Sequence, residues 1–422
     1  MNTLKKIWDR LFLQERPSIS LSLFRLFVAF TVMAHVLPSF FHMADNYYPT
    51  AFKTWNGSFF TAGVLHLVAQ SPVWLINFFA AVFCLFSFFF LVGFLSQISC
   101  ILTTVACYYF YALNSFHVGT LSWDILLVTL FLMCLTPYHG DYFSVDAFLW
   151  GEPDRYRRHR PYFIQRLLQI QIGMTFFHTG LTKVWPAGNW FSDNPLYYVM
   201  NYPPEGTTKM FLLRDWLRTR PEVCLHLGHA IVILEFLMFF LLAWRKTRIS
   251  AIYLGILFHI LLILTLDVPA TFFFLFPAQL CLFLDPRDIL RWIERRRLWH
   301  ASATKPRTVI YDGDCGVCKA LIKRIQMADL FAVCAYVPYQ SIENFAALHP
   351  TLTQERCQYE LVLAESGREV FGGFDAVRRL CFSHPPFYPL LFLFYFPGMG
   401  IIGSAAYKIF ARFRSKTSCQ LP

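Results

Sequence analysis

Long apolar runs separated by short polar segments dominate the first 300 residues of the chain. A helix that crosses a membrane needs about 20 mainly apolar residues, and about eight runs come close to this length. The third, seventh and eighth runs are short. The predicted spans are Ser18–Phe41, Pro72–Leu95, Ile98–Leu113, Leu121–Tyr138, Tyr162–Leu181, Val223–Trp244, Ile249–Leu266 and Ala270–Leu284. This pattern predicts an α-helical membrane bundle of about eight transmembrane helices.

Basic residues between the spans predict the orientation of the bundle. With the N-terminus in the cytoplasm, the inside segments contain basic clusters at residues 5–16, 155–166, 245–248 and 287–297, whereas the outside segments carry few Lys or Arg. Cytoplasmic loops carry an excess of positive charge in membrane proteins. We therefore expect a multi-pass protein of a bacterial inner membrane with both termini cytoplasmic. The long segment Thr182–Glu222 would lie outside, and a connection of this length is usually functional or disordered.

Composition supports a membrane protein and changes how the net charge is interpreted. Apolar residues make up 56% of the chain and charged residues 15%, whereas the net charge is +11. Such a charge is typical of proteins that bind nucleic acid, but here the basic residues lie between apolar runs and not on one folded face. We expect the lipid bilayer as a partner and no nucleic acid.

After about Lys305 the pattern becomes that of a soluble α/β domain. It predicts a membrane domain over residues 1–300 and a second domain over 301–422. Glu365-Ser366-Gly367 is a hairpin signal between two short strands. The predicted elements are strands at Thr308–Tyr311, Phe331–Val337, Tyr359–Ala364 and Arg368–Phe371, and helices at Val317–Gln326 and Phe374–Cys381.

The last apolar stretch, Phe387–Gly403, is interrupted by Pro397 and followed by basic residues. If it crossed the membrane, those charges would lie outside. We therefore expect a helix that lies in the membrane plane or packs on the domain.

A Cys-x-x-Cys pair is the strongest chemical signal in the chain. In the segment from Tyr311 to Lys319, a strand leads through a turn to Cys315 and Cys318 at the start of a helix. Free N–H groups and the helix dipole at this position stabilise negative charge on sulfur. Cys315 would be the attacking thiolate and Cys318 the resolving thiol.

Two other interpretations of this segment remain open. A zinc half-site would need two more ligands, and none of Cys334, Cys357 and His349 forms a second close pair. Asp312-Gly313-Asp314 is similar to the Asp-x-Asp of phosphotransferases.

The segment closely resembles the DCC family of thiol-disulfide oxidoreductases, through Asp312, Cys315 and Cys318. The resemblance covers about residues 306–415 and includes Gly372–Val377 and Tyr407–Arg414. It implies a thioredoxin-like α/β fold, with Asp312 among the site residues. It also implies thiol chemistry that requires no cofactor, and a thiol or disulfide protein or a reductant as partner. Thioredoxins carry a cis-proline just before the hairpin, where this chain reads Arg356-Cys357-Gln358-Tyr359.

Ionisable residues inside the predicted spans form a second group of candidates, because such residues are costly in a membrane and are often functional. The alternative is a buried network that only fixes helix packing. We also considered a metal site formed by His226, His229, Glu235 and His259, but the sequence as a whole predicts none. The candidates are Arg25, His35, Asp124, His178, Lys183, His226, His229, Glu235 and His259.

The membrane part is similar to the horizontally transferred transmembrane (HTTM) domain, whose superfamily includes vitamin K-dependent γ-glutamyl carboxylase. The resemblance runs over about residues 15–295 and is strongest from His178 to Trp185 and at Gly188-Asn189-Trp190. It implies Lys183 as a catalytic base and a quinone or vitamin K-like ligand near Arg25, His178, Glu235 and His259. Further matches are Ser144-Val145-Asp146, Phe258-His259 and Leu284-Asp285-Pro286-Arg287.

Two departures count against glutamate carboxylation. The carboxylase has a functional histidine where this chain reads Leu121-Ser122-Trp123-Asp124, and the α/β domain takes the place of its large substrate-binding domain. The sequence therefore favours a membrane-anchored thiol-disulfide oxidoreductase. The alternatives are an HTTM-type carboxylase or quinone-linked enzyme with Lys183 as base, and a scaffold for peptide maturation.

Overall fold

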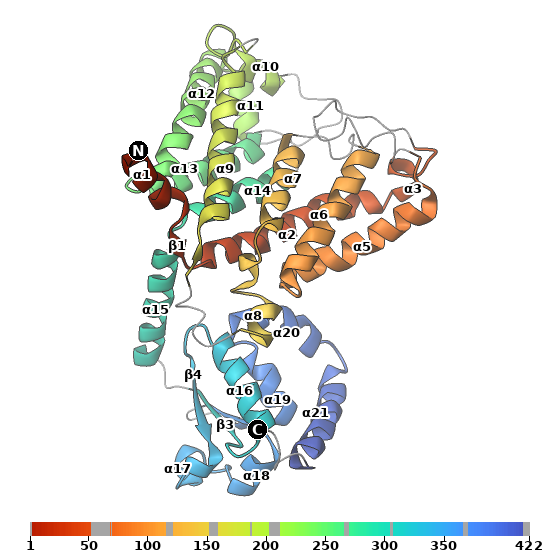
Figure 1. Cartoon of the computed structure of the whole chain (residues 1–422), viewed down its shortest axis with the longest axis vertical. Helices are drawn as coiled ribbons and strands as arrows, with labels where there is room; N and C mark the ends of the chain where they lie inside the picture. The colour runs from red at the N-terminus through yellow and green to blue at the C-terminus, as the bar shows by residue number, and fades with distance from the viewer. Residues whose placement is uncertain are drawn as a thin grey trace. The chain divides into compact units, whose positions relative to one another are not determined.

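The computed structural model describes residues 2–51, 68, 70–114, 121–151, 159–185, 188–201, 212–265, 270–303, 307–365 and 370–416 (Figure 1). The chain divides into two compact units. The first comprises residues 1–147 and 154–286, and the second comprises residues 148–153 and 287–422. Each unit is described by itself.

Every predicted span contains a helix in the first unit. Five of these helices, α2, α5, α6, α12 and α13, are long and apolar enough to cross a membrane. The number of eight spans is not established, because α7 and α14 are short and α9 is less apolar. The helices are α2 (Ile19–Phe40), α5 (Val73–Val92), α6 (Ser96–Leu113), α7 (Leu121–Cys134), α9 (Phe163–Thr182), α12 (Pro221–Ala243), α13 (Arg248–Thr265) and α14 (Ala270–Leu280).

Short elements connect these helices. Strands β1 and β2 pair in antiparallel fashion ahead of α2 and α9. In the connection after α9, residues 186–187 and 202–211 lie outside the described residues, and most of the rest folds into α10 and α11. The short elements are α1 (Asn2–Phe12), β1 (Glu15–Arg16), α3 (Met43–Asn46), η1 (Tyr138–Gly140), α8 (Val145–Leu149), β2 (Arg160–Pro161), α10 (Pro195–Asn201), α11 (Leu212–Arg218) and η3 (Cys281–Phe283).

Helix α2 supplies much of the core of the first unit, where Phe24, Val28 and Val32 are fully buried. Helices α9 and α12 lie side by side (Figure 1). Their close approach depends on glycine, since a Cβ at Gly173 would lie 2.7 Å from the ring of Phe239. This contact between α9 and α12 brings Lys183, at the end of α9, next to Glu235 inside α12.

The second unit is built on a four-stranded sheet in the order β4-β3-β5-β6. Strand β3 is parallel to β4 and antiparallel to β5, which is antiparallel to β6. Val309 points to one core and its neighbour Ile310 to the other, as alternation along a strand requires. The strands are β3 (Arg307–Tyr311), β4 (Cys334–Pro338), β5 (Val362–Ala364) and β6 (Val370–Gly372).

Helices surround this sheet, and the order of strands and helices is the α/β, thioredoxin-like arrangement that the sequence predicts. The helix that follows β3 begins directly after the first cysteine of the pair. The helices are α15 (Pro286–Ala303), α16 (Gly316–Ala328), η4 (Tyr339–Ser341), α17 (Phe345–Leu348), α18 (Gln354–Tyr359), α19 (Gly373–Leu380), η5 (Pro385–Phe387), α20 (Tyr388–Phe394) and α21 (Met399–Lys416).

Several element boundaries differ from the predicted ones for local reasons. Strand β5 begins at Val362, three residues later than expected, because the chain up to Tyr359 forms helix α18. Strand β4 begins three residues later than expected, because Ala332 has a φ of 52° and Asp329 accepts hydrogen bonds from the N–H groups of Val333 and Cys334. The predicted apolar stretch at the C-terminus forms two helices, since the chain breaks at Pro397 and at Gly398, whose φ is 88°. The turn of the predicted hairpin, residues 366–369, lies outside the described residues.

Candidate functional site

The two cysteines of the pair lie where strand β3 gives way to helix α16. Cys315 is the N-cap residue of α16, and its Sγ accepts a hydrogen bond from the N–H of Cys318 at 3.4 Å. Both are free thiols, with Cys315 3% and Cys318 8% exposed. The Sγ of Cys315 therefore lies at the N-terminus of α16, where the helix presents its free N–H groups.

Gln340, which the sequence did not single out, holds the loop before the cysteines. Its Oε1 accepts from the N–H of Gly313 at 2.9 Å. Its Nε2 donates to Asp312 at 2.8 Å and to Asp314 at 3.1 Å. Asp312 also accepts from the N–H of Asp314 at 3.0 Å. In these contacts Asp312 orders the loop that positions Cys315.

Three further cysteines among the described residues of this domain have raised pKa values. Burial raises the pKa of Cys357 and of Cys381 to about 11 in each case. Burial, together with the charge of Asp329, raises the pKa of Cys334 to about 12. Because the thiolate is the reactive form, these three side chains remain protonated and unreactive near neutral pH.

A buried polar cluster lies at the other end of the sheet. Ligand atoms of Asp329, Cys334 and His384 lie within 4.8 Å of one another, and this is the one such group found among the described residues. The Tyr336 hydroxyl lies between them, 3.2 Å from Asp329 and 2.9 Å from His384 Nε2. Nδ1 of His384 donates to the Leu380 carbonyl at 2.8 Å. A hydrogen-bond network centred on the Tyr336 hydroxyl therefore links Asp329 with His384.

In the first unit, Lys183 and Glu235 form an ion pair between the end of α9 and the middle of α12. Lys183 Nζ lies 2.8 and 2.6 Å from the two carboxylate oxygens and 3.3 Å from the carbonyl of Thr179. It also lies 5.4 Å from the centre of a Trp190 ring. The Glu235 side chain is 8% exposed. The ammonium therefore has an acceptor for each of its three protons.

Arg25 is completely buried and contacts the loop between α5 and α6. Its Nη2 donates to the carbonyl of Phe143. Asp146 accepts hydrogen bonds from the N–H groups of Leu95 and Ser96, both at 2.7 Å, and thereby caps α6. A Cβ on Gly93, whose φ is 71°, would lie 1.6 Å from Arg25 Nη1. Arg25 and Asp146 therefore fasten this loop from two sides.

The remaining candidates of the membrane part do not gather at one point. His259 Nδ1 donates to the Gly255 carbonyl at 2.7 Å, and the imidazole ring stacks on Phe276. Asp124 accepts from Tyr111. His178 and His226 are exposed, and His35 and His229 are partly buried. Among the described residues, no metal-ligand group includes a histidine of this unit.

Comparison with protein-family models assigns most of the chain to two known domain families. The HTTM domain model matches residues 14–287. The chain belongs to the HTTM family. A second model, the DCC1-like thiol-disulfide oxidoreductase, matches residues 309–420. Searches of curated proteins and of solved structures find no match.

These matches confirm the predicted fusion of an HTTM domain with a DCC-type domain. Within the HTTM domain, the structure joins Lys183 to Glu235 and places Arg25 and the Ser144-Val145-Asp146 segment on the same loop. It keeps His259 in an aromatic environment. Gln340 was missed because it lies far from the cysteines in sequence. Its proximity follows from the register of β3 and β4, which places Tyr311 opposite Pro338.

Proposed function

We propose that this membrane protein is a thiol-disulfide oxidoreductase in which Cys315 is the nucleophile and Cys318 the resolving thiol. The DCC1-like match supports the reaction class. The observation that carries the assignment of roles is the position of Cys315 as the helix cap, with Cys318 one turn later. Asp312 and Gln340 act as positioning residues, because they hold the loop and do not contact the sulfurs.

The exchange requires only the two thiols and a partner disulfide. The Cys315 thiolate attacks one sulfur of the partner, the partner's S–S bond breaks, and the released thiolate takes a proton from solvent. Cys318 then loses its proton and attacks Sγ of Cys315, which releases the second partner thiol. Two electrons pass to the partner, and the pair becomes a disulfide. A reductant restores the dithiol.

The test is Cys318→Ser in the full chain. This variant should retain a mixed disulfide between Cys315 and its partner, because the resolving thiol is missing, and mass spectrometry should identify the link. In the native protein Cys315 should alkylate before Cys318. Cys357→Ser, which removes a buried cysteine outside the pair, is the control and should trap nothing. Absence of a trapped disulfide in Cys318→Ser, or faster alkylation of Cys318, would contradict the assignment.

We also propose that the chain lies in a bacterial inner membrane with both termini in the cytoplasm, based on the distribution of Lys and Arg. A reporter fused after Arg297 should be active only in a cytoplasmic form, and one in the 182–222 connection only in an external form. The reverse pattern of activities would overturn this orientation.

The alternative function is a quinone-linked HTTM enzyme with Lys183 as base. A base needs a free lone pair, whereas Lys183 Nζ lies at hydrogen-bond distance from both carboxylate oxygens of Glu235, so this role would require the pair to open. Lys183→Arg keeps this ion pair but is a far poorer base. Full function of that variant would exclude the base role, and loss of function with an unchanged melting temperature would favour it.

A further inference from the structure

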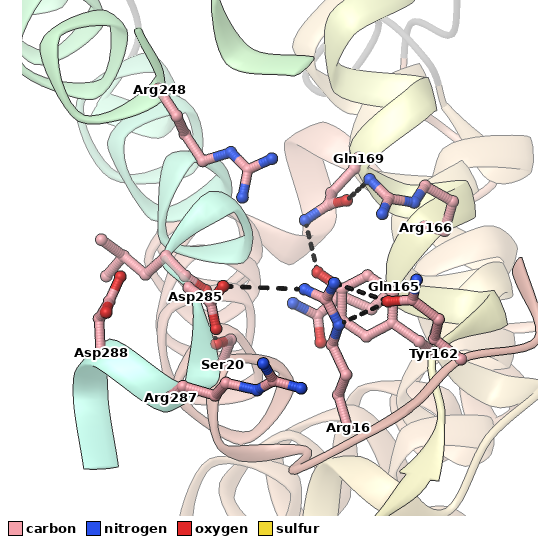
Figure 2. Close-up of polar contacts among 12 residues, drawn as sticks. Arg16, Ser20, Tyr162, Gln165, Arg166, Gln169, Arg248, Asp285, Arg287 and Asp288 are labelled. Atoms are coloured by element: carbon pink, nitrogen blue, oxygen red, sulfur yellow. Dashed lines mark hydrogen bonds and ion pairs between the residues drawn. The ribbon is translucent and has the colours of Figure 1, made fainter. Parts of the chain in front are cut away.

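Three arginines of the first unit, Arg16, Arg166 and Arg248, point toward one region at the ends of the membrane helices, and two of them lie over the ring of Tyr162 (Figure 2). The guanidinium carbons of Arg16 and Arg166 lie 4.8 and 5.2 Å from the ring centre of Tyr162. Arg248 is the first residue of α13, and its side chain points toward the same region (Figure 2). The three come from β1, α9 and α13, so the fold and not a local run of sequence brings them together.

Each guanidinium is held in place by polar groups of the protein. Gln14 accepts from Arg16 at 3.0 and 2.6 Å. Arg166 donates to a carbonyl of α1 at 3.1 Å and to Gln169 at 2.7 Å, and Gln169 in turn donates to Tyr162 at 2.9 Å. Arg248 donates to carbonyls at the end of α12 at 3.1 and 3.2 Å. The donors are therefore oriented before any ligand arrives.

Part of the donor capacity is not used by the protein. Nη2 of Arg166 and Nη1 of Arg248 make no hydrogen bond to a residue that the structure describes. Asp285 contributes a carboxylate, at 3.9 Å from Nη1 of Arg16. Three guanidinium groups and one nearby carboxylate leave an excess of positive charge, and all three arginines are half-buried.

The ends of the helices add to this charge. Helices α2, α9 and α13 begin at Ile19, Phe163 and Arg248, so all three present their N-termini near the arginines. A helix N-terminus carries a partial positive charge and free N–H groups, both of which attract anions. The cluster thus combines oriented guanidinium groups with three favourable dipoles.

We propose that Arg16, Arg166 and Arg248 form a binding site for a phosphate group, supplied by the headgroup of an anionic phospholipid. The guanidinium fork matches the oxygens of a phosphate, and an ammonium does not offer the same geometry. The site lies at the ends of predicted spans, the level at which lipid headgroups meet the protein. Basic pockets between transmembrane helices are known to bind anionic headgroups. This inference does not depend on the thiol chemistry.

The test measures the thermal unfolding of the delipidated full chain in detergent. Phosphatidylglycerol should raise the melting temperature, and phosphatidylcholine should not. Arg166→Gln and Arg248→Gln should each weaken the apparent affinity for phosphatidylglycerol by about tenfold or more, the effect of losing a charged hydrogen bond. Arg248→Lys, which keeps the charge, should bind phosphatidylglycerol with intermediate affinity. This result would show that the weaker binding of Arg248→Gln does not come from misfolding.

Lys246→Gln is the matched control, because it removes one exposed positive charge from the same loop as Arg248. This variant should keep the full response to lipid. If inorganic phosphate protects the native protein and phosphatidylglycerol does not, the phosphate site is supported but a soluble ligand replaces the lipid. The proposal would be overturned if phosphatidylglycerol raised the melting temperature equally in all variants. It would also be overturned if neither phosphatidylglycerol nor inorganic phosphate raised the melting temperature of the native protein.

Discussion

At the scale of single residues, the loop before the cysteines depends on one amide side chain. Asp312 and Asp314 would repel each other and would oppose a thiolate nearby. The Nε2 group of Gln340 lies between the two carboxylates and donates to both. A glutamine is well suited to this position because it offers a donor for the carboxylates and an acceptor for the N–H of Gly313.

Gln340→Ala should slow thiol exchange by about tenfold, because losing these hydrogen bonds costs on the order of 1 kcal/mol or more and loosens the loop. Gln340→Glu should be slower still, since it adds a third carboxylate beside Asp312 and Asp314. The rate of mixed-disulfide formation with a small disulfide measures both effects. Gln326→Ala, an exposed position on α16, is the control. An unchanged rate in Gln340→Ala would show that the loop does not position Cys315.

At the scale of helices, the contact between α9 and α12 carries an ion pair whose partners are unequally buried. Lys183 is 21% exposed and Glu235 8% exposed at the side chain. Removing one partner leaves a charge that is largely shielded from water, whereas removing both leaves two apolar side chains in contact. The two changes should therefore differ sharply in their effect on stability.

Lys183→Met should lower the free energy of unfolding by about 2–4 kcal/mol, because it leaves the Glu235 carboxylate without its partner. The double variant Lys183→Met, Glu235→Met should recover most of this loss. Thermal or denaturant unfolding in detergent measures both proteins. If the double variant loses as much free energy of unfolding as Lys183→Met and Glu235→Met lose together, the pair does not act as a unit.

The same scale shows what the sequence could predict. Apolar runs are long and strongly patterned, so a helix was found in each predicted span, and the β3-turn-α16 unit was evident from its short-range signals. The partner of Lys183 was not evident, because the spacing between Lys183 and Glu235 depends on how α9 packs on α12. The start of β4 was placed too early, since the left-handed backbone of Ala332 has no clear signal in an apolar segment.

At the scale of the whole chain, the C-terminal helices show an apolar surface that the rest of the α/β domain does not cover. Helix α21 packs on α19, yet Ile401 and Ile402 are 80% and 61% exposed, and Phe396 before them is 66% exposed. Exposed apolar patches mark surfaces that bind a membrane or another protein. The packing of α21 on α19 agrees with a helix packed on the domain, and a position of its apolar face in the membrane plane stays a prediction.

A photo-crosslinking residue at Ile402 should label lipid in native membranes, because this face would lie on the bilayer. The same residue at Glu355, an exposed polar position of the same domain, should label no lipid. Mass spectrometry of the cross-linked products distinguishes the two. Cross-links from Ile402 to protein alone would show that another polypeptide covers this face.

The contact between Gly93 and Arg25 has a consequence for the divergence of the family. No side chain fits at Gly93 while a full-length arginine occupies position 25, since the two would overlap within 1.6 Å. A side chain added at position 93 alone would therefore disturb the loop before α6. A descendant of this protein could acquire a larger residue at position 93 only if position 25 shortened first or at the same time and if Ser144, whose Cβ would lie 2.4 Å from the new Cβ, also moved. The two positions should therefore evolve as a linked pair, although they are far apart in the sequence.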